Sequence, residues 1–181
     1  MEDVRYVIIA LSRLLDRNDR EAVSERLSSF RPYKDDSTAE FLTEHAIDME
    51  LNNLSRTYLA VSDDGVILGF VSVGIKCLKT GNLEGISNEI IGRINPDPRT
   101  GIIQAYLLGQ LARSKDAPKG MGRELLDYAM AIFRRAKTLI GCDIVRLDCV
   151  DQMEPYYEKL KFRHFKKNKD NDLNQMLTFI D

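Results

Sequence analysis

The sequence lacks any long apolar stretch. No run approaches the roughly 20 apolar residues that a membrane-spanning helix needs, and the first apolar stretch, "VIIAL", is short and followed by charges. That stretch also lacks the basic start and the small-residue cleavage site of a secretion signal. We therefore expect no membrane contact and a cytoplasmic location.

The sequence has few cysteines and no large excess of positive or negative charge. Cys77, Cys142 and Cys149 are too few and too scattered for a disulfide framework. No C-x-x-C spacing supports a zinc site or a dithiol redox centre, so we expect no metal site and three small buried hydrophobic residues. The formal net charge of −2 argues against a protein built mainly to grip nucleic acid.

Repeats, low-complexity tracts and linker-like segments are not evident either, so one domain is expected over residues 1–181. What is present is a hydrophobic pattern whose period changes along the chain. Period two predicts strands and period 3.6 predicts helices. Their order is strand 4–10 (with helix as the alternative there), helices 19–28 and 35–54, strands 56–62 and 66–78 joined by a D-G turn, helix 87–94, strand 101–114, helix 121–140, strand 143–150, helix 153–160, and strands 161–167 and 174–180. The order predicts an α/β or α+β sheet with helices on both faces.

The stretch "KDAPKGMGRELLDYAM" at residues 115–130 places two glycines before a helix. Gly120 and Gly122 let the backbone approach a bulky anion, and the helix start offers unpaired N–H groups and the positive end of its dipole. Lys119 and Arg123 add charge, so the segment is a candidate anion site. A plain flexible helix start is the alternative. The spacing is neither a dinucleotide fingerprint nor a P-loop.

A second candidate is "YYEKLKF", where Tyr156 and Tyr157 lie on a short helix after a strand expected to be buried. A tyrosine hydroxyl can act as a general acid toward a leaving group of similar proton affinity, such as a thiolate. Taken alone, two tyrosines on a helix are more often packing aromatics.

Together, "KGMGRELL" and "YYEKLKF" resemble two motifs of the GNAT family of acetyl-CoA-dependent N-acetyltransferases. The first family motif is R/Q-x-x-G-x-G/A before a helix carrying "LL", and the second is similar to "YEKLGF", matched here by residues 157–162. The resemblance covers residues 102–180 and extends more loosely to residues 41–61. It implies a mixed, mostly antiparallel central sheet with helices on both faces and splayed central strands that hold CoA.

The resemblance also implies a set of site residues and a reaction. The CoA pyrophosphate would lie on the backbone of Lys119, Gly120, Met121, Gly122 and Arg123, and the pantetheine arm would run beside Leu111, Ala112 and Arg113. Tyr157 would protonate the departing thiolate after direct attack of a primary amine on acetyl-CoA. The acceptor is not identified, and homodimers are common in the family.

The sequence departs from the family pattern at a few positions. The leading Arg or Gln of the glycine motif is Ala117, Pro118 removes one backbone N–H from the loop, and the glycine of "YEKLGF" is Lys161. No clear counterpart exists for the asparagine that commonly precedes the tyrosine helix; Asp151 is the nearest polar residue. These departures bear on the tightness of CoA binding more than on the fold.

The general base and the acceptor remain open. Glu44, Glu50, His45 and, through a water, Gln110 are candidate bases; we expect the glutamates to be solvated and His45 to be buried. The basic cluster at residues 159–169 is expected to be a solvated edge, with contact to CoA phosphates or RNA as alternatives. "SRTYL" and "LLGQLA" resemble the branch that includes toxins acetylating aminoacyl-tRNA, and a non-catalytic module with the same fold is the third hypothesis.

Overall fold

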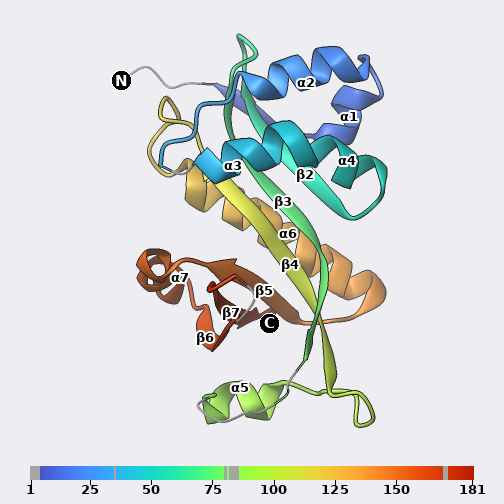
Figure 1. Ribbon diagram of the computed structural model, residues 1–181, viewed down its shortest axis with the longest axis vertical. Coiled ribbons are helices and arrows are strands. Elements are labelled where there is room, and N and C mark those ends of the chain that lie inside the picture. The colour runs from blue at the N-terminus through green and yellow to red at the C-terminus, as the bar shows by residue number, and fades with distance from the viewer. Residues whose placement is uncertain (1–4, 35, 80, 82–85, 169–170) are drawn as a thin grey trace. The chain divides into compact units, whose positions relative to one another are not determined.

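The computed structural model describes residues 5–34, 36–79, 81, 86–168 and 171–181 (Figure 1). The chain forms two compact units, one of residues 1–74 and 108–132 (unit 1) and one of residues 75–107 and 133–181 (unit 2). The seven strands form one sheet in the order β1-β2-β3-β4-β5-β7-β6. Two of these strands have residues in both units: β3 (Ile67–Lys79) and β4 (Ile102–Arg113). No helix among the described residues is long and apolar enough to cross a membrane.

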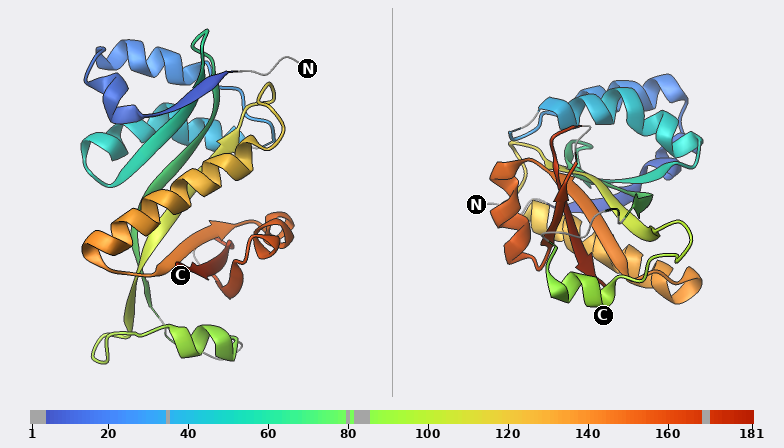
Figure 2. Two further views of the ribbon diagram at one scale, coloured as in Figure 1. Left: turned by 180° about the vertical axis from the view of Figure 1, so that it is seen from behind. Right: turned by 60° about the horizontal axis from the view of Figure 1, so that its bottom comes forward.

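Unit 1 is an antiparallel sheet with helices on both of its faces. β1 (Tyr6–Ala10) pairs with β2 (Ser55–Ser62), which pairs with β3. One face packs against α1 (Leu11–Leu15), α2 (Arg20–Ser28) and α4 (Ala46–Leu51), through a core that includes Leu59 and Phe70. The other face meets α6 (Met121–Ile140), where the rings of Tyr58 and Tyr128 lie 5.2 Å apart. Figure 2 shows this layering from two further sides.

Close packing on the α6 face depends on Gly69 in β3. A Cβ at that position would lie 2.8 Å from the carbonyl oxygen of Ala112 and 2.9 Å from the Leu125 side chain. Since contacts this short do not occur at real Cβ atoms, only glycine lets β4 and α6 come so near.

Unit 2 is built on the antiparallel strands β5 (Ile144–Cys149), β7 (Asn174–Phe179) and β6 (Arg163–Lys167). A short helix, α5 (Asn88–Arg93), is capped by the Ser87 hydroxyl and buries Ile90 in the core of this unit. After β5 come a single 3-10 turn (Asp151–Met153) and α7 (Glu154–Lys159), which carries Pro155 in its first turn.

Most predicted elements are confirmed, including the hairpin with Gly65 at φ +88° and the stop of α6 at Gly141, φ +81°. Val4 of the predicted first strand and Lys169 of the basic cluster lie outside the described residues. The expected splay of the central strands stays a prediction. The seven-stranded, mostly antiparallel sheet itself agrees with the predicted fold class.

The predicted helix 35–54 is divided into three pieces. α3 (Asp36–Glu40) leads into a π-helical turn (Phe41–His45), and α4 follows. The wider turn takes an extra residue, so it changes which of the following side chains face the core. Ala46, Ile47 and Glu50 are buried, and His45 is exposed.

The burial predictions for several polar and sulfur-bearing residues were wrong. His45 is exposed rather than buried, and Glu50 is only 4% exposed rather than solvated. Cys77 is exposed and Cys142 is half-buried, so only Cys149 is the buried hydrophobic residue expected of all three.

Candidate functional site

The glycine loop begins at a firmly held residue at the end of β4. Ser114 is 2% exposed, its N–H donates to the Leu68 carbonyl at 2.7 Å, and its hydroxyl accepts from the Asp116 N–H at 3.1 Å. Ser114 also forms a β-bridge with Pro32. These contacts fix where the loop leaves the sheet, and sequence reasoning did not single Ser114 out.

The loop and the first turn of α6 present backbone donors that the protein does not use. The N–H of Met121 donates to Pro118, and the carbonyl oxygen of Gly120 accepts from the N–H groups of Arg123 and Glu124. Among the described residues, the N–H groups of Lys119, Gly120 and Gly122 have no hydrogen-bond acceptor. Unpaired donors at a helix start, with the positive end of the helix dipole, favour an anion.

Both glycines keep this surface open. Gly120 has φ +100°, a conformation that other residues rarely adopt, and a Cβ at either Gly120 or Gly122 would meet no atom within 4 Å. The space beside both glycines is therefore open to a phosphate that approaches the free N–H groups.

The remaining predicted loop residues contribute in different ways. Lys119 is exposed, and the Arg123 guanidinium lies 2.9 Å from the exposed carboxylate of Asp127. The Met121 side chain is fully buried in the core, so only its backbone reaches the loop surface. The charge available to an anion thus comes from Lys119 and, in part, from Arg123.

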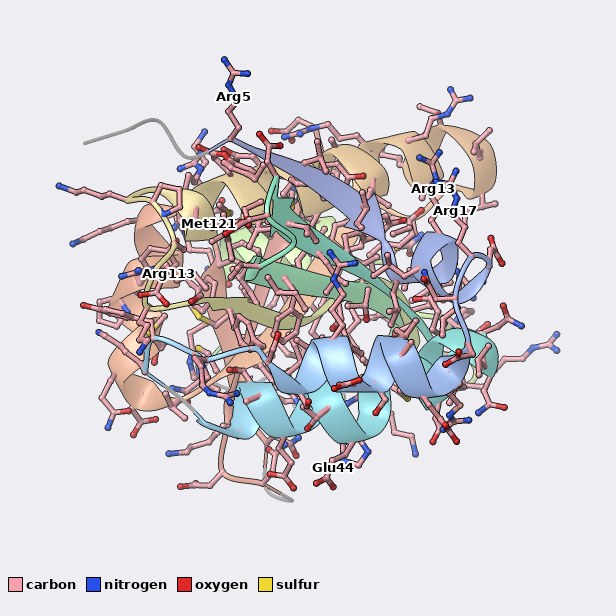
Figure 3. The ribbon with its side chains drawn as sticks, turned by 90° about the horizontal axis from the view of Figure 1, so that it is seen from above. Arg5, Arg13, Arg17, Glu44, Arg113 and Met121 are labelled. Carbon is pink, nitrogen blue, oxygen red and sulfur yellow. The ribbon has the colours of Figure 1, made fainter. Side chains whose placement is uncertain are left out.

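The predicted pantetheine strand, Leu111 to Arg113, lies half-buried at the end of β4. The Arg113 guanidinium lies over the Tyr33 ring at 3.7 Å, and its carbonyl oxygen accepts from the Tyr33 N–H at 2.9 Å. Figure 3 shows Arg113 and Met121 at the same end of unit 1, with Glu44 on the outer side of its helix, away from the loop. Unit 1 therefore brings the predicted strand and loop residues together.

Tyr157 lies in unit 2, on α7, and is 8% exposed. Its ring makes edge contacts with Tyr156 at 5.2 Å and Phe162 at 5.8 Å, and its carbonyl oxygen accepts from the Leu160 and Phe162 N–H groups. Tyr156 is more exposed than Tyr157. The helix and the turn after it thus hold the Tyr157 ring in one position.

Burial raises the pKa of the Tyr157 hydroxyl well above its ordinary value, and the nearby Cys149 and Tyr156 add to the rise. Burial likewise raises the pKa of the Cys149 thiol to about 11. Both groups therefore stay protonated and uncharged at neutral pH.

The four candidate bases all belong to unit 1, but their environments differ. Glu44 and His45 are exposed. With Glu40 they form a group in which one possible metal-ligand atom of each residue lies within 4.8 Å of the others, and no second such group exists among the described residues. The Gln110 N–H donates to the Ser72 hydroxyl at 2.8 Å. None of these contacts singles out a base.

Glu50 differs from the other candidates because it is buried. Its Oε2 accepts from the Thr57 N–H at 2.9 Å, and Arg56 Nη1 lies 3.4 Å from Oε1 without hydrogen-bond geometry. Burial raises the pKa of this carboxyl group, while the Thr57 N–H and Arg56 oppose the rise. Glu50 thus ties α4 to the start of β2.

Neither a protein-family model nor a curated protein sequence matches the chain. Solved structures do match. AtaT complexed with acetyl-methionyl-tRNAfMet is 19% identical with a TM-score of 0.74, covering 97% of this chain and 95% of that one. A tyrosine-to-phenylalanine mutant of KacT is 21% identical, with the same TM-score and coverage. AtaTR bound with acetyl-CoA is 17% identical with a TM-score of 0.69, covering 99% and 94%. The chain therefore has the GNAT-like fold of AtaT and KacT over nearly its whole length.

Proposed function

We propose that the protein is an N-acetyltransferase that transfers the acetyl group of acetyl-CoA to a primary amine. The observation that carries the proposal is the glycine loop, with free N–H groups at Lys119, Gly120 and Gly122 at the start of a 20-residue helix. In this proposal the loop from Lys119 to Arg123 binds the CoA pyrophosphate, and residues 111–113 of β4 line the pantetheine arm. The likeness to AtaTR bound with acetyl-CoA supports this choice of anion.

In this proposal Tyr157 is the general acid that protonates the leaving thiolate. The amine nitrogen attacks the thioester carbonyl, the carbon–sulfur bond breaks, and the Tyr157 hydroxyl gives its proton to the departing thiolate. The phenolate then regains a proton from solvent, and the acetylated nitrogen gives its extra proton to solvent. The phenol is protonated when the thiolate forms, which the role requires; the raised pKa of Tyr157 makes it a weaker acid than a free tyrosine and adds no driving force to the transfer.

The Tyr157→Phe variant tests this assignment through the rate of thiol release from acetyl-CoA. A general acid contributes on the order of 10² to 10⁴ in rate, so we expect a loss of that size with unchanged acetyl-CoA affinity. Tyr156→Phe is the matched control, since it removes the same atom from the neighbouring ring. An unchanged rate in Tyr157→Phe would refute the role of Tyr157 without refuting the class of reaction.

A non-catalytic module with the same fold is the competing reading, suggested by Ala117 and Pro118 in the loop. Titration calorimetry with acetyl-CoA separates the two. Binding heat and a thermal shift support the transferase, and their absence at millimolar acetyl-CoA favours the module.

A second, narrower candidate is an aminoacyl-tRNA acceptor, with the amine being the α-amino group of the attached amino acid. It is favoured by the fold shared with AtaT, whose structure contains acetyl-methionyl-tRNAfMet. A tyrosine-to-phenylalanine mutant of AtaT has been solved bound to the C-terminus of the antitoxin AtaR, so an antitoxin partner belongs to the same candidate. Homodimer formation remains a prediction.

The acceptor is tested by offering charged tRNA, the same tRNA without its amino acid, and the free amino acid. We expect acetyl transfer to the charged tRNA alone, together with arrest of translation when the protein is expressed. Equal transfer to the free amino acid, or expression without effect on growth, rules this acceptor out and leaves the transferase proposal standing.

A further inference from the structure

Unit 2 contains a cavity that the proposed reaction does not use. Its volume is about 290 Å³, and it lies among the end of β3, β5, β6 and β7. The lining combines one apolar residue with cations and amides: Leu78, Lys79, Arg146, Lys166, Lys167, Asn168 and Gln175. We call this cavity the basic pocket.

Arg146 is a buried residue of the pocket lining, and hydrogen bonds hold its side chain in place. It is 4% exposed, and its Nε and Nη2 donate to the two carboxylate oxygens of Asp148 at 2.7 Å each. Its Nη1 points to the Cys77 carbonyl oxygen at 3.5 Å. A guanidinium held in this way is fixed in place, and its charge is largely matched by Asp148.

Lys167 has carboxylate partners, whereas Lys166 has none among the described residues. Lys167 lies 3.4 Å from Asp151 and 3.3 Å from Asp172, and these partners raise its pKa. Lys166 donates to the Lys79 carbonyl oxygen at 2.6 Å and has no carboxylate within ion-pair distance in the described part of the chain. Burial and the charge of Arg146 lower the pKa of Lys166. An anion beside Lys166 would relieve that unfavourable field.

Gln175 adds a polar atom that the protein leaves unsatisfied. Its side chain is 6% exposed, it lines the basic pocket, and its Oε1 has no hydrogen-bond partner. Buried polar atoms are paired in the great majority of cases, because leaving one unpaired costs free energy. Because Oε1 is itself covered by protein atoms, the amide must rotate to present it to the basic pocket, where a ligand satisfies it with a donor such as a hydroxyl group.

The distribution of charge along the chain agrees with an anionic ligand for unit 2. This unit holds 14 of the 26 lysines and arginines but only 11 of the 28 aspartates and glutamates, a net charge of +3, which leaves −5 for unit 1. The small net charge of the whole chain therefore hides a basic part.

We propose that the basic pocket binds a ribose phosphate, with Lys166 contacting the phosphate and Gln175 accepting from a ribose hydroxyl. An anion alone would leave the Gln175 acceptor unpaired, and a neutral sugar would leave Lys166 without an anionic partner. A ribose phosphate meets both requirements, and it can come from an RNA strand or from a free nucleotide. The binding needs no acetyl transfer, so the proposal stands apart from the proposed function.

The test uses the full chain without acetyl-CoA and three probes: a labelled 12-nucleotide RNA, DNA of the same sequence, and adenosine 3′,5′-bisphosphate as a competitor. Affinity is measured by fluorescence anisotropy over a range of salt concentrations. We expect Lys166→Gln to weaken RNA binding about tenfold and to lower the slope of log affinity against log salt by about one. Lys159→Gln removes the same charge outside the basic pocket and is expected to change neither value.

The Gln175→Met variant separates recognition from folding. It keeps the side-chain volume and removes the unpaired acceptor, so its melting temperature should not fall, while its preference for RNA over DNA should disappear. Loss of binding in Lys166→Gln for the bisphosphate alone assigns the basic pocket to a nucleotide, and loss for RNA assigns it to a strand. Equal effects of Lys166→Gln and Lys159→Gln, or no binding of any probe at millimolar concentration, overturn the proposal.

Discussion

Lys161 explains why the family pattern carries a glycine after the tyrosine helix. Its φ is +69°, in the left-handed region, and its N–H donates to the Glu158 carbonyl at 3.0 Å. This turn sends the chain back so that Phe162, 1% exposed, packs against Tyr157. The departure from glycine is therefore tolerated at a cost in strain and leaves the position of Tyr157 intact.

We predict that Lys161→Gly raises the free energy of unfolding by about 1 kcal/mol, because a side chain in the left-handed region costs about 1–2 kcal/mol. Thermal or urea unfolding measures the change. Lys159→Gly, within α7, is the matched control and should lower stability by about 1 kcal/mol. A loss of stability in Lys161→Gly would contradict the strain argument.

The free energy of unfolding should fall at alkaline pH because of Cys149. Its pKa is raised from 9.0 to about 11 in the folded chain, so the unfolded chain releases this proton first as the pH rises. The neutral thiol contributes on the order of 2 kcal/mol to the free energy of unfolding. This contribution is fully present below pH 9 and is lost between pH 9 and 11. Tyr157 acts in the same direction at higher pH.

The Cys149→Ala variant should therefore lose less stability than the wild type between pH 8 and 10.5, although it starts lower because a buried side chain has been shortened. Urea unfolding at several pH values gives the two curves. Parallel curves over this range would show that Cys149 does not titrate as described.

At the scale of elements, the start of α6 combines two properties that a substitution can separate. Gly122 is the second residue of the helix, where helix propensity and the dipole favour other residues, yet its open surface is what an anion needs. A change there can thus stabilise the helix while blocking the ligand.

We predict that Gly122→Glu raises the melting temperature, by the equivalent of about 1 kcal/mol, and abolishes acetyl-CoA binding through charge repulsion. Gly122→Ala should give a similar gain in stability and retain binding, since the family pattern allows either residue at this position. Calorimetry and thermal unfolding of both variants provide the comparison. Retained acetyl-CoA affinity in Gly122→Glu would argue against the pyrophosphate assignment.

At the scale of the whole molecule, three elements belong to both units. β3 crosses the boundary at residues 74 and 75, β4 at 107 and 108, and α6 at 132 and 133. A strand or helix shared in this way cannot keep its hydrogen bonds in one unit while the other unit unfolds around it.

We therefore predict one cooperative unfolding transition for residues 1–181, with equal calorimetric and van't Hoff enthalpies. Differential scanning calorimetry measures both. Two resolved transitions would instead mean that the units unfold independently, and the expectation of a single domain would be wrong.

The sequence alone determined the order of the elements and the glycine loop. Local rules suffice there: alternating and helical periods for the strands and helices, a positive φ at Gly65, and a glycine at Gly120 where φ is +100°. Only the tertiary structure decided that Glu50 is buried, that His45 and Cys77 are exposed, and that Arg146, Lys166 and Gln175 line one cavity. The physical reason is that burial and pairing depend on residues brought together from distant positions by the sheet, whereas backbone conformation depends mainly on neighbours along the chain.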